Sequence, residues 1–289
     1  MLITIFTPTY NRAHLLPRLY ESLCKQTFKD FEWVIVDDGS VDETRNVVAG
    51  FEDDNEKFQI HYYNQENGGK HRAINRGVKE AKGELFFIAD SDDWLPENAL
   101  EMVVAAYEKV KDDKNIAGIV GLDCYDNGSI IGSGLPKDVI DCNAIEIRLK
   151  YQVTGDLKEV FRISVLREFP FPEIDGERFC PEQLVWFRIA QKYKLRYFNK
   201  PIYIAEYQEQ GITSNITNVR MKSPIASMMT YAELNSYDIP FASKIKAAIN
   251  YWRFRFCSDA AEKPSLAWWW GWTAPIGYLM HLNDVRESH

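Results

Sequence analysis

The chain has 289 residues, of which 46% are hydrophobic, so it can bury one large core. Its formal net charge of −8 argues against a general nucleic-acid binder, because phosphate contacts require a basic surface. The five cysteines are far apart and never form a Cys-x-x-Cys pair, which indicates neither a disulfide framework nor a zinc site and favours a reducing compartment.

Short apolar runs alternate with helical stretches through the first 122 residues. Runs rich in Ile, Val and Phe predict buried strands at residues 2–7, 33–36, 58–63, 85–89 and 117–122. The intervals between them predict helices at residues 12–26, 42–50, 70–82 and 97–111. The N-terminal run is too short for a signal peptide, so we expect it to be the first strand. The alternation predicts an α/β sheet.

The regular alternation ends near residue 123, where glycines and a proline mark turns between short extended pieces. Helical spacing returns at residues 181–193 and is followed by extended runs at 196–198 and 202–207. Two further helices are predicted at 223–238 and 241–259.

Three carboxylates follow the fourth predicted strand within four positions: Asp90, Asp92 and Asp93, in the run Asp-Ser-Asp-Asp. Like charges this close are unfavourable unless a cation neutralises them, and Mg²⁺ or Mn²⁺ binds one or two carboxylates together with phosphate oxygens. The pattern therefore favours a divalent-metal site for a diphosphate. The alternative is an acidic turn that caps the helix that follows.

Three other turns carry polar residues at positions where ligands bind in open α/β sheets. The first is Thr7-Pro8-Thr9-Tyr10-Asn11-Arg12, and the second is Asp37-Asp38-Gly39-Ser40, whose acidic residues could accept hydrogen bonds from a ribose or a base. The third runs through Gly68-Gly69-Lys70 into a helix, where backbone N–H groups and Lys70 could hold negative oxygens. His71 is open between a ligand contact and an ordinary helix residue.

These four motifs resemble, in order and approximate spacing, those of glycosyltransferase family two over residues 1–122. The resemblance implies a GT-A fold: a Rossmann-like mixed sheet flanked by helices, here with a C-terminal helical extension. It divides the chain into a nucleotide-sugar-binding half (1–122), an acceptor-binding half of the same domain (123–220) and the extension (221–289). It also implies an inverting, metal-dependent hexosyltransferase that moves a sugar from a nucleotide-diphosphate donor to a hydroxyl of a glycan or lipid-linked acceptor.

The resemblance also assigns residues. The donor nucleotide would be bound by Thr7, Pro8, Tyr10, Asp38, Lys70, Asp90 and Ser91. Asp92 and Asp90 would hold Mn²⁺ or Mg²⁺. The family's catalytic base is usually part of a Glu-Asp pair at the start of a later helix, and this chain has Pro181-Glu182 there.

Glu182 is therefore the predicted base, in a first helical turn that suits an ionised carboxylate, with Glu177 and Asp175 in reserve. A purely structural role in that turn is the alternative for Glu182. A late polar loop with Gln210, Thr213 and Ser214 resembles one that closes near the diphosphate in bacterial relatives. If no carboxylate serves as the base, the chain is a catalytically inactive nucleotide-sugar-binding protein of the same fold.

Residues 266–282 are apolar and rich in tryptophan but broken by Gly271, Pro275 and Gly277. Clustered Trp and Tyr suit the membrane interface, whereas the breaks disfavour a spanning helix. We expect peripheral membrane contact here, or alternatively a segment docked on the protein's own core. With the resemblance, this places the chain in the cytoplasm, at the inner face of a bacterial plasma membrane, in cell-surface polysaccharide biosynthesis.

Overall fold

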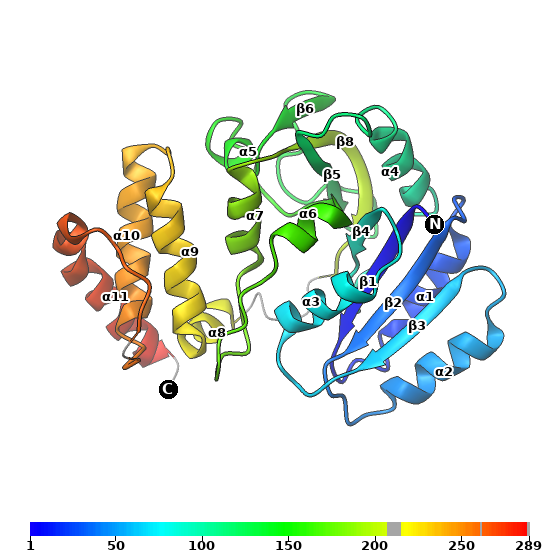
Figure 1. The fold of residues 1–289 in the computed structure, drawn as a ribbon, viewed down its shortest axis with the longest axis horizontal. Helices are drawn as coiled ribbons and strands as arrows, with labels where there is room; N and C mark the ends of the chain where they lie inside the picture. Colours follow the sequence, from blue (N-terminus) through cyan, green and yellow to red (C-terminus); the bar gives the residue numbers. More distant parts are fainter. Residues whose placement is uncertain (207–214, 261, 288–289) are drawn as a thin grey trace. The chain divides into compact units, whose positions relative to one another are not determined.

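The computed structural model describes residues 1–206, 215–260 and 262–287 (Figure 1). The chain forms two compact units. Unit 1 consists of Met1–Pro170 and Arg188–Glu206, and unit 2 consists of Phe171–Phe187 and Tyr207–His289. Unit 2 therefore takes one short segment from the middle of the chain and its whole C-terminal part.

Unit 1 is built on one mixed sheet of eight strands in the order β3-β2-β1-β4-β7-β5-β8-β6. The strands are β1 (Ile3–Thr9), β2 (Phe31–Asp37), β3 (Gln59–Asn64), β4 (Leu85–Ile88), β5 (Ile116–Cys124), β6 (Val139–Cys142), β7 (Leu157–Arg162) and β8 (Lys194–Ile204). Strands β1 to β4 pair in parallel, β7 runs antiparallel to its neighbours β4 and β5, and β8 is parallel to β5. The carboxyl ends of β1, β2, β4, β5 and β8 therefore share one edge, together with the start of β7.

The helices of unit 1 are α1 (Leu16–Lys25), α2 (Thr44–Asp54), α3 (Lys70–Glu80), α4 (Ala99–Tyr107), α5 (Glu146–Leu149) and α6 (Ile163–Glu168). The predicted α/β alternation is confirmed. Several predicted helix ends are displaced by a few residues. The helix expected from Arg12, for example, begins at Leu16, because Asn11 adopts a left-handed conformation with φ of +53° and a turn precedes the helix. The two extended runs predicted near residues 196–207 form one strand, β8.

The core of unit 1 lies against the sheet. Strands β2 and β5 are buried along their whole length, and Trp33, Phe87 and Leu100 join one cluster from two strands and a helix. Each large apolar side chain buried in this way stabilises the fold by about 1.5–3 kcal/mol relative to its exposed state. This packing fixes the strand ends, where the polar motifs begin.

Every regular element of unit 2 within the described residues is a helix. Its elements are α8 (Ile216–Lys222), α9 (Pro224–Ser236), α10 (Phe241–Arg255), the 3₁₀ helix η2 (Trp268–Thr273) and α11 (Ala274–Glu287). Helix α7 (Glu182–Ala190) begins in unit 2 and ends in unit 1.

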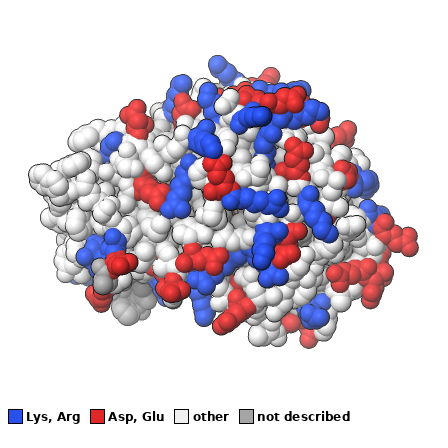
Figure 2. All heavy atoms as spheres, viewed as in Figure 1, with Lys and Arg blue, Asp and Glu red and all other residues white. Residues whose placement is uncertain are grey.

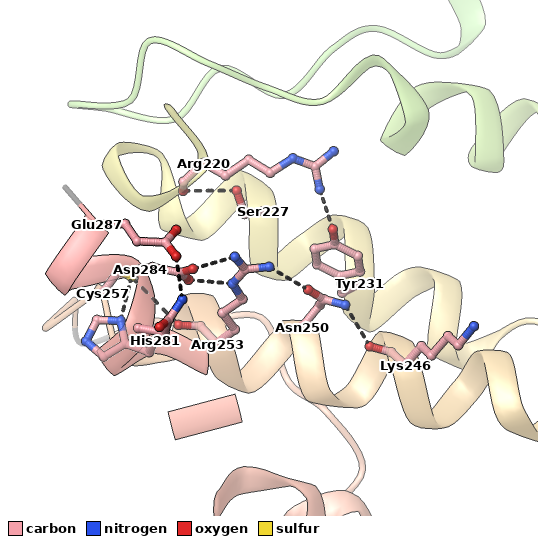
Figure 3. A network of polar contacts seen from close by, with 11 residues as sticks. Arg220, Ser227, Tyr231, Lys246, Asn250, Arg253, Cys257, His281, Asp284 and Glu287 are labelled. Carbon is pink, nitrogen blue, oxygen red and sulfur yellow. Dashed lines mark hydrogen bonds and ion pairs between the residues drawn. The ribbon is translucent and has the colours of Figure 1, made fainter. Parts of the chain in front are cut away.

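A buried ion pair joins α10 to α11 in unit 2. Arg253 donates from Nε and Nη2 to the two carboxylate oxygens of Asp284, at 2.5 and 2.6 Å (Figure 3). Removing one partner of a buried pair costs about 3–5 kcal/mol, because the other charge remains buried and unpaired. This pair holds the C-terminal helix to α10, and the cluster of Met228, Tyr251 and Phe254 packs α9 against α10.

The tryptophan-rich segment 266–282 is partly packed against the rest of unit 2 and partly exposed. Trp270 is buried, and Gly277 packs so closely that a Cβ there would lie 2.6 Å from Cβ of Trp252 in α10. Trp268, Trp269 and Trp272 are exposed. None of the described helices has both the length and the hydropathy that crossing a bilayer requires.

Candidate active site

The four sequence motifs meet at the carboxyl edge of the sheet, in unit 1. The first two are joined through Asn11, whose backbone N–H donates to Oγ of Ser40 while its side-chain oxygen accepts from the N–H of Val41, both at 2.8 Å. The left-handed conformation of Asn11 permits this reciprocal pair. The ends of β1 and β2 are thereby held as one surface.

The Asp37-Asp38 pair organises the glycine loop. The carboxylate of Asp38 is buried and accepts hydrogen bonds from the N–H groups of Gly68 and Gly69, at 3.0 and 2.7 Å. Asp37 accepts from the Tyr62 hydroxyl at 2.5 Å. These two glycine N–H groups are thus bonded to a carboxylate of the protein, and the prediction that N–H groups at the start of α3 hold negative oxygens stays a prediction.

Basic side chains from the other motifs neutralise the acidic cluster. Nζ of Lys70 lies 2.6 Å from Oδ1 of Asp90, and Nη1 of Arg12 lies 2.9 Å from Oδ2 of Asp92. Burial acts to raise the pKa of Asp90, but the charges of Lys70 and Lys158 outweigh it and lower that pKa below its ordinary value. Such partly exposed ion pairs contribute about 1 kcal/mol or less, so incoming phosphate oxygens or a cation can exchange with them.

The alternative in which the acidic cluster caps the next helix is wrong. Helix α4 begins at Ala99, and its N-cap Asn98 makes no side-chain capping hydrogen bond. Asp93 instead accepts a hydrogen bond from the N–H of Glu206, at 3.0 Å. Burial, reinforced by the charge of Asp90, raises the pKa of Asp93 to about 6, although Lys158 opposes the shift.

Two side chains that sequence reasoning missed, those of Arg18 and Tyr203, hold the Asp-Ser-Asp-Asp turn. Nη2 of Arg18 donates to the backbone oxygen of Asp92 and to Oε2 of Glu206, both at 2.6 Å, and its guanidinium lies 3.8 Å from the ring centroid of Trp94. The hydroxyl of Tyr203 accepts from the N–H of Asp90 at 2.7 Å. The turn is thus fixed from α1 and from the end of β8.

A further buried carboxylate lies at the same sheet edge. Asp123, at the end of β5, is only 5% exposed, and its Oδ1 has no hydrogen-bond partner. Burial raises its pKa to about 7, opposed by Lys158. Nζ of Lys158, at the start of β7, lies 3.5 Å from the ring centroid of Tyr203.

The remaining predicted donor residues lie along the same edge but differ in exposure. Thr7 is fully buried, and its hydroxyl accepts from Nε1 of Trp33 at 2.9 Å. Ser91 is buried, Pro8 is half-buried, and the Tyr10 side chain is 48% exposed. Tyr10 therefore offers an open aromatic face, as a nucleobase requires, whereas Thr7 supports the strand from within.

The predicted bases belong to unit 2. Glu182 is the first residue of α7. Glu177, held in reserve, is buried and accepts hydrogen bonds from the N–H groups of Ile225 and Ala226, at 2.6 and 2.9 Å, so it caps α9. Burial raises the pKa of Glu177 against these hydrogen bonds. The loop residues Gln210, Thr213 and Ser214 lie outside the described residues.

The carboxylates at the sheet edge are ligands of the type that a hard divalent cation prefers. They do not form a complete set of protein ligands for it. Among the described residues, no three His, Cys, Asp or Glu side chains are grouped so that they could hold a metal by themselves. Mg²⁺ and Mn²⁺ sites that use substrate phosphates need only one or two carboxylates. Asp90 and Asp92 therefore fit such an ion when a diphosphate supplies the other ligands.

Solved structures with this architecture are GT-A fold glycosyltransferases. TarS of S. aureus, residues 1–349 in complex with UDP, superimposes with a TM-score of 0.64 at 21% identity, over 90% of this chain and 73% of TarS. A mannosyltransferase of Pyrobaculum calidifontis, in complex with GDP-Man and Mn²⁺, has a TM-score of 0.58 at 19% identity, over 98% and 75% of the two chains. The fold of this protein is accordingly GT-A.

Sequence comparison identifies one domain. Residues 4–128 match glycosyl transferase family 2. An uncharacterized glycosyltransferase of Rickettsia felis is 34% identical over 217 residues, which are 73% of this chain and 35% of the relative. The chain thus spans about a third of that relative's length. The Escherichia coli UDP-Glc:alpha-D-GlcNAc-diphosphoundecaprenol beta-1,3-glucosyltransferase is 29% identical over 74% of this chain and 80% of its own length.

Proposed function

We propose that the protein is an inverting, metal-dependent glycosyltransferase. It moves a hexose from a nucleoside-diphosphate donor to a hydroxyl of a glycan or lipid-linked acceptor in bacterial surface-polysaccharide biosynthesis. The observation that carries the proposal is the interlocking of four motifs at one sheet edge, where Arg12 and Lys70 contact the carboxylates of Asp92 and Asp90. The names of the relatives supply the substrate classes, and UDP is the first donor nucleotide to test.

The donor site follows from the chemistry of this edge. Tyr10 would stack on the base, and Lys70 would turn from Asp90 toward the diphosphate, since a partly exposed pair exchanges at small cost. Asp90 and Asp92 would hold Mn²⁺ or Mg²⁺, which when bound offsets the charge that develops on the leaving diphosphate. Thr7, Pro8, Asp38 and Ser91 would shape the nucleotide pocket, with Asp38 acting through the glycine loop.

The acceptor hydroxyl needs a base, because its proton leaves as the new glycosidic bond forms. Glu182 is our candidate: it is the first residue of α7, where the helix dipole favours an ionised carboxylate. The donor then transfers its sugar in one displacement without a covalent enzyme intermediate. We further propose that the enzyme works in the cytoplasm, in peripheral contact with the inner face of the plasma membrane through residues 266–282.

The test is a thermal-shift panel of UDP, GDP, dTDP and CMP, with Mn²⁺ or with a chelator. A nucleotide at about 100 times its dissociation constant should stabilise the chain by roughly 2.7 kcal/mol. We expect one nucleoside diphosphate to stabilise the wild type in the presence of Mn²⁺ and to lose that effect in Asp92→Asn. The control Asp53→Asn changes an exposed carboxylate of α2 and should retain the shift. Absence of any nucleotide shift would overturn the donor site.

A further inference from the structure

The largest exposed apolar side chains of the described chain gather on the C-terminal part of unit 2. Trp268, Trp269 and Trp272 of η2 are 85%, 59% and 55% exposed, and Leu279 of α11 is 67% exposed. Ile276 and Leu282 extend the same surface along α11, at spacings of three and four residues from these side chains. We call Trp268, Trp269, Trp272, Ile276, Leu279 and Leu282 the tryptophan surface. Monomeric soluble proteins rarely leave such a surface without a partner.

The tryptophan surface stands on a packed scaffold. Trp270 is 5% exposed, and its backbone oxygen accepts hydrogen bonds from Oγ1 of Thr273 and Nε1 of Trp252, at 2.7 and 3.3 Å. The close approach of Gly277 to α10 leaves no room for a side chain on that side of α11. One face of the segment is therefore committed to α10, and the other is held outward in a defined arrangement.

Charge separates this region from the rest of the chain. Residues 264–283 contain no Lys, Arg, Asp or Glu; Glu262 and Lys263 precede them, and Asp284, Arg286 and Glu287 follow them. Residues 241–289 hold six basic against four acidic residues, whereas the whole chain has 34 against 42. The balance is thus +2 in this segment and −10 in the remainder. Figure 2 shows the part of the surface over α10 and α11 as largely free of charged side chains.

We propose that the tryptophan surface binds the headgroup region of an anionic lipid bilayer. Trp is the residue that membrane interfaces favour, because its ring is apolar while its N–H remains hydrogen-bonded to headgroups or water. An uncharged surface within a segment of net charge +2, in a chain that is otherwise acidic, complements anionic lipid. The proposal rests in one respect on the proposed function, since a lipid-linked acceptor would itself lie in such a bilayer.

The experiment is co-sedimentation of the full chain with vesicles. We compare vesicles of phosphatidylcholine alone with vesicles that contain one third phosphatidylglycerol, and follow tryptophan emission in the same samples. The wild type should bind the anionic vesicles at least several-fold more tightly than the neutral ones, with emission shifted to the blue. Raising the NaCl concentration should weaken the preference, because screening removes the electrostatic part.

A triple substitution tests whether the tryptophan surface itself carries the binding. Trp268→Ala, Trp269→Ala and Leu279→Ala together remove exposed side chains only, so the fold should be retained. Vesicle affinity should fall at least about tenfold, because each anchor loses most of its burial in the bilayer. The control Tyr125→Ala removes a 43% exposed aromatic ring from unit 1 and should bind like the wild type.

Nucleotide binding separates the two proposals. The UDP thermal shift, measured on the same preparations, should be equal in the wild type and the triple variant, so loss of vesicle binding cannot be confused with loss of the donor site. Equal vesicle binding by the wild type and the triple variant would overturn the proposal. So would a wild type that binds no vesicles, or one that forms a dimer which the triple substitution dissociates, since the surface would then join two copies.

Discussion

The sheet edge of unit 1 and the helical surface of unit 2 offer opposite chemistry to solvent. At the sheet edge, carboxylates and basic side chains from four separate motifs contact one another, as in the pairs Lys70–Asp90 and Arg12–Asp92. On unit 2, six apolar side chains are exposed, in a stretch, residues 264–283, that contains no Lys, Arg, Asp or Glu. The first region suits a small, highly charged ligand, and the second suits an extended apolar phase. Under the two proposals above, one chain combines a soluble donor with a membrane-bound acceptor.

The largest effect should come from the proposed base in unit 2. Glu182→Gln should lower the transfer rate on the order of 10²–10⁴-fold, because the amide cannot accept the acceptor's proton. UDP binding, which we assign to unit 1, should remain within about twofold. The measurement is release of UDP from a UDP-sugar, alongside the nucleotide thermal shift. Glu262→Gln, an exposed control in unit 2, should retain activity, and an unchanged rate in Glu182→Gln would assign the base elsewhere.

An intermediate effect should follow from loosening the acidic turn in unit 1. Arg18→Met removes the hydrogen bonds to Asp92 and Glu206, so UDP in the presence of Mn²⁺ should bind about tenfold more weakly. Arg18→Lys, which keeps the charge, should recover part of the affinity. Titration by fluorescence or calorimetry measures both. Lys25→Met alters an exposed cation on the same helix and serves as the control; equal affinities in Arg18→Met and Lys25→Met would refute the role.

The last effect is on stability at the edge of the sheet rather than on rate or binding. With a pKa of about 7 in the folded state, Asp123 keeps its proton at pH values where the unfolded chain has lost it. Its contribution to stability therefore falls as pH rises from about 4 to about 7, by at most about 4 kcal/mol. Asp123→Asn should raise the melting temperature by several degrees at pH 8 and by little at pH 5. The exposed control Asp126→Asn should show no such difference between the two pH values.

Local sequence signals predicted the strands and the motif positions because those signals depend on neighbouring residues. The apolar runs before Asp37 and Asp90 became buried strands, and their polar ends met at one edge as parallel pairing requires. The partners of those residues were not predictable in the same way. Tyr203 and Lys158 lie at this edge because of the places that β8 and β7 take in the sheet, with β7 between β4 and β5 and β8 between β5 and β6. The order of the strands has no local signal in the sequence.

The role of Asp38 shows the same limit. Its type and position indicated a ligand contact, but the fold brings the N–H groups of Gly68 and Gly69 to its carboxylate. The tryptophan segment was ambiguous from sequence because its two faces have similar composition. Only the packing of Gly277 and Trp270 against α10 decides which side chains remain exposed. Contacts between distant segments decided both cases.

The most direct test of the central claim is a transfer assay with UDP-glucose or UDP-GlcNAc, Mn²⁺ and an undecaprenyl-diphosphate-linked GlcNAc acceptor analogue, with products separated by chromatography. Our account predicts a longer glycan with the wild type and with Asp53→Asn, and none with Asp92→Asn. If the wild type binds UDP in an Mn²⁺-dependent way yet transfers no sugar from any donor in a nucleotide-sugar panel, the protein is a nucleotide-sugar-binding member of the fold, which would contradict the proposed activity.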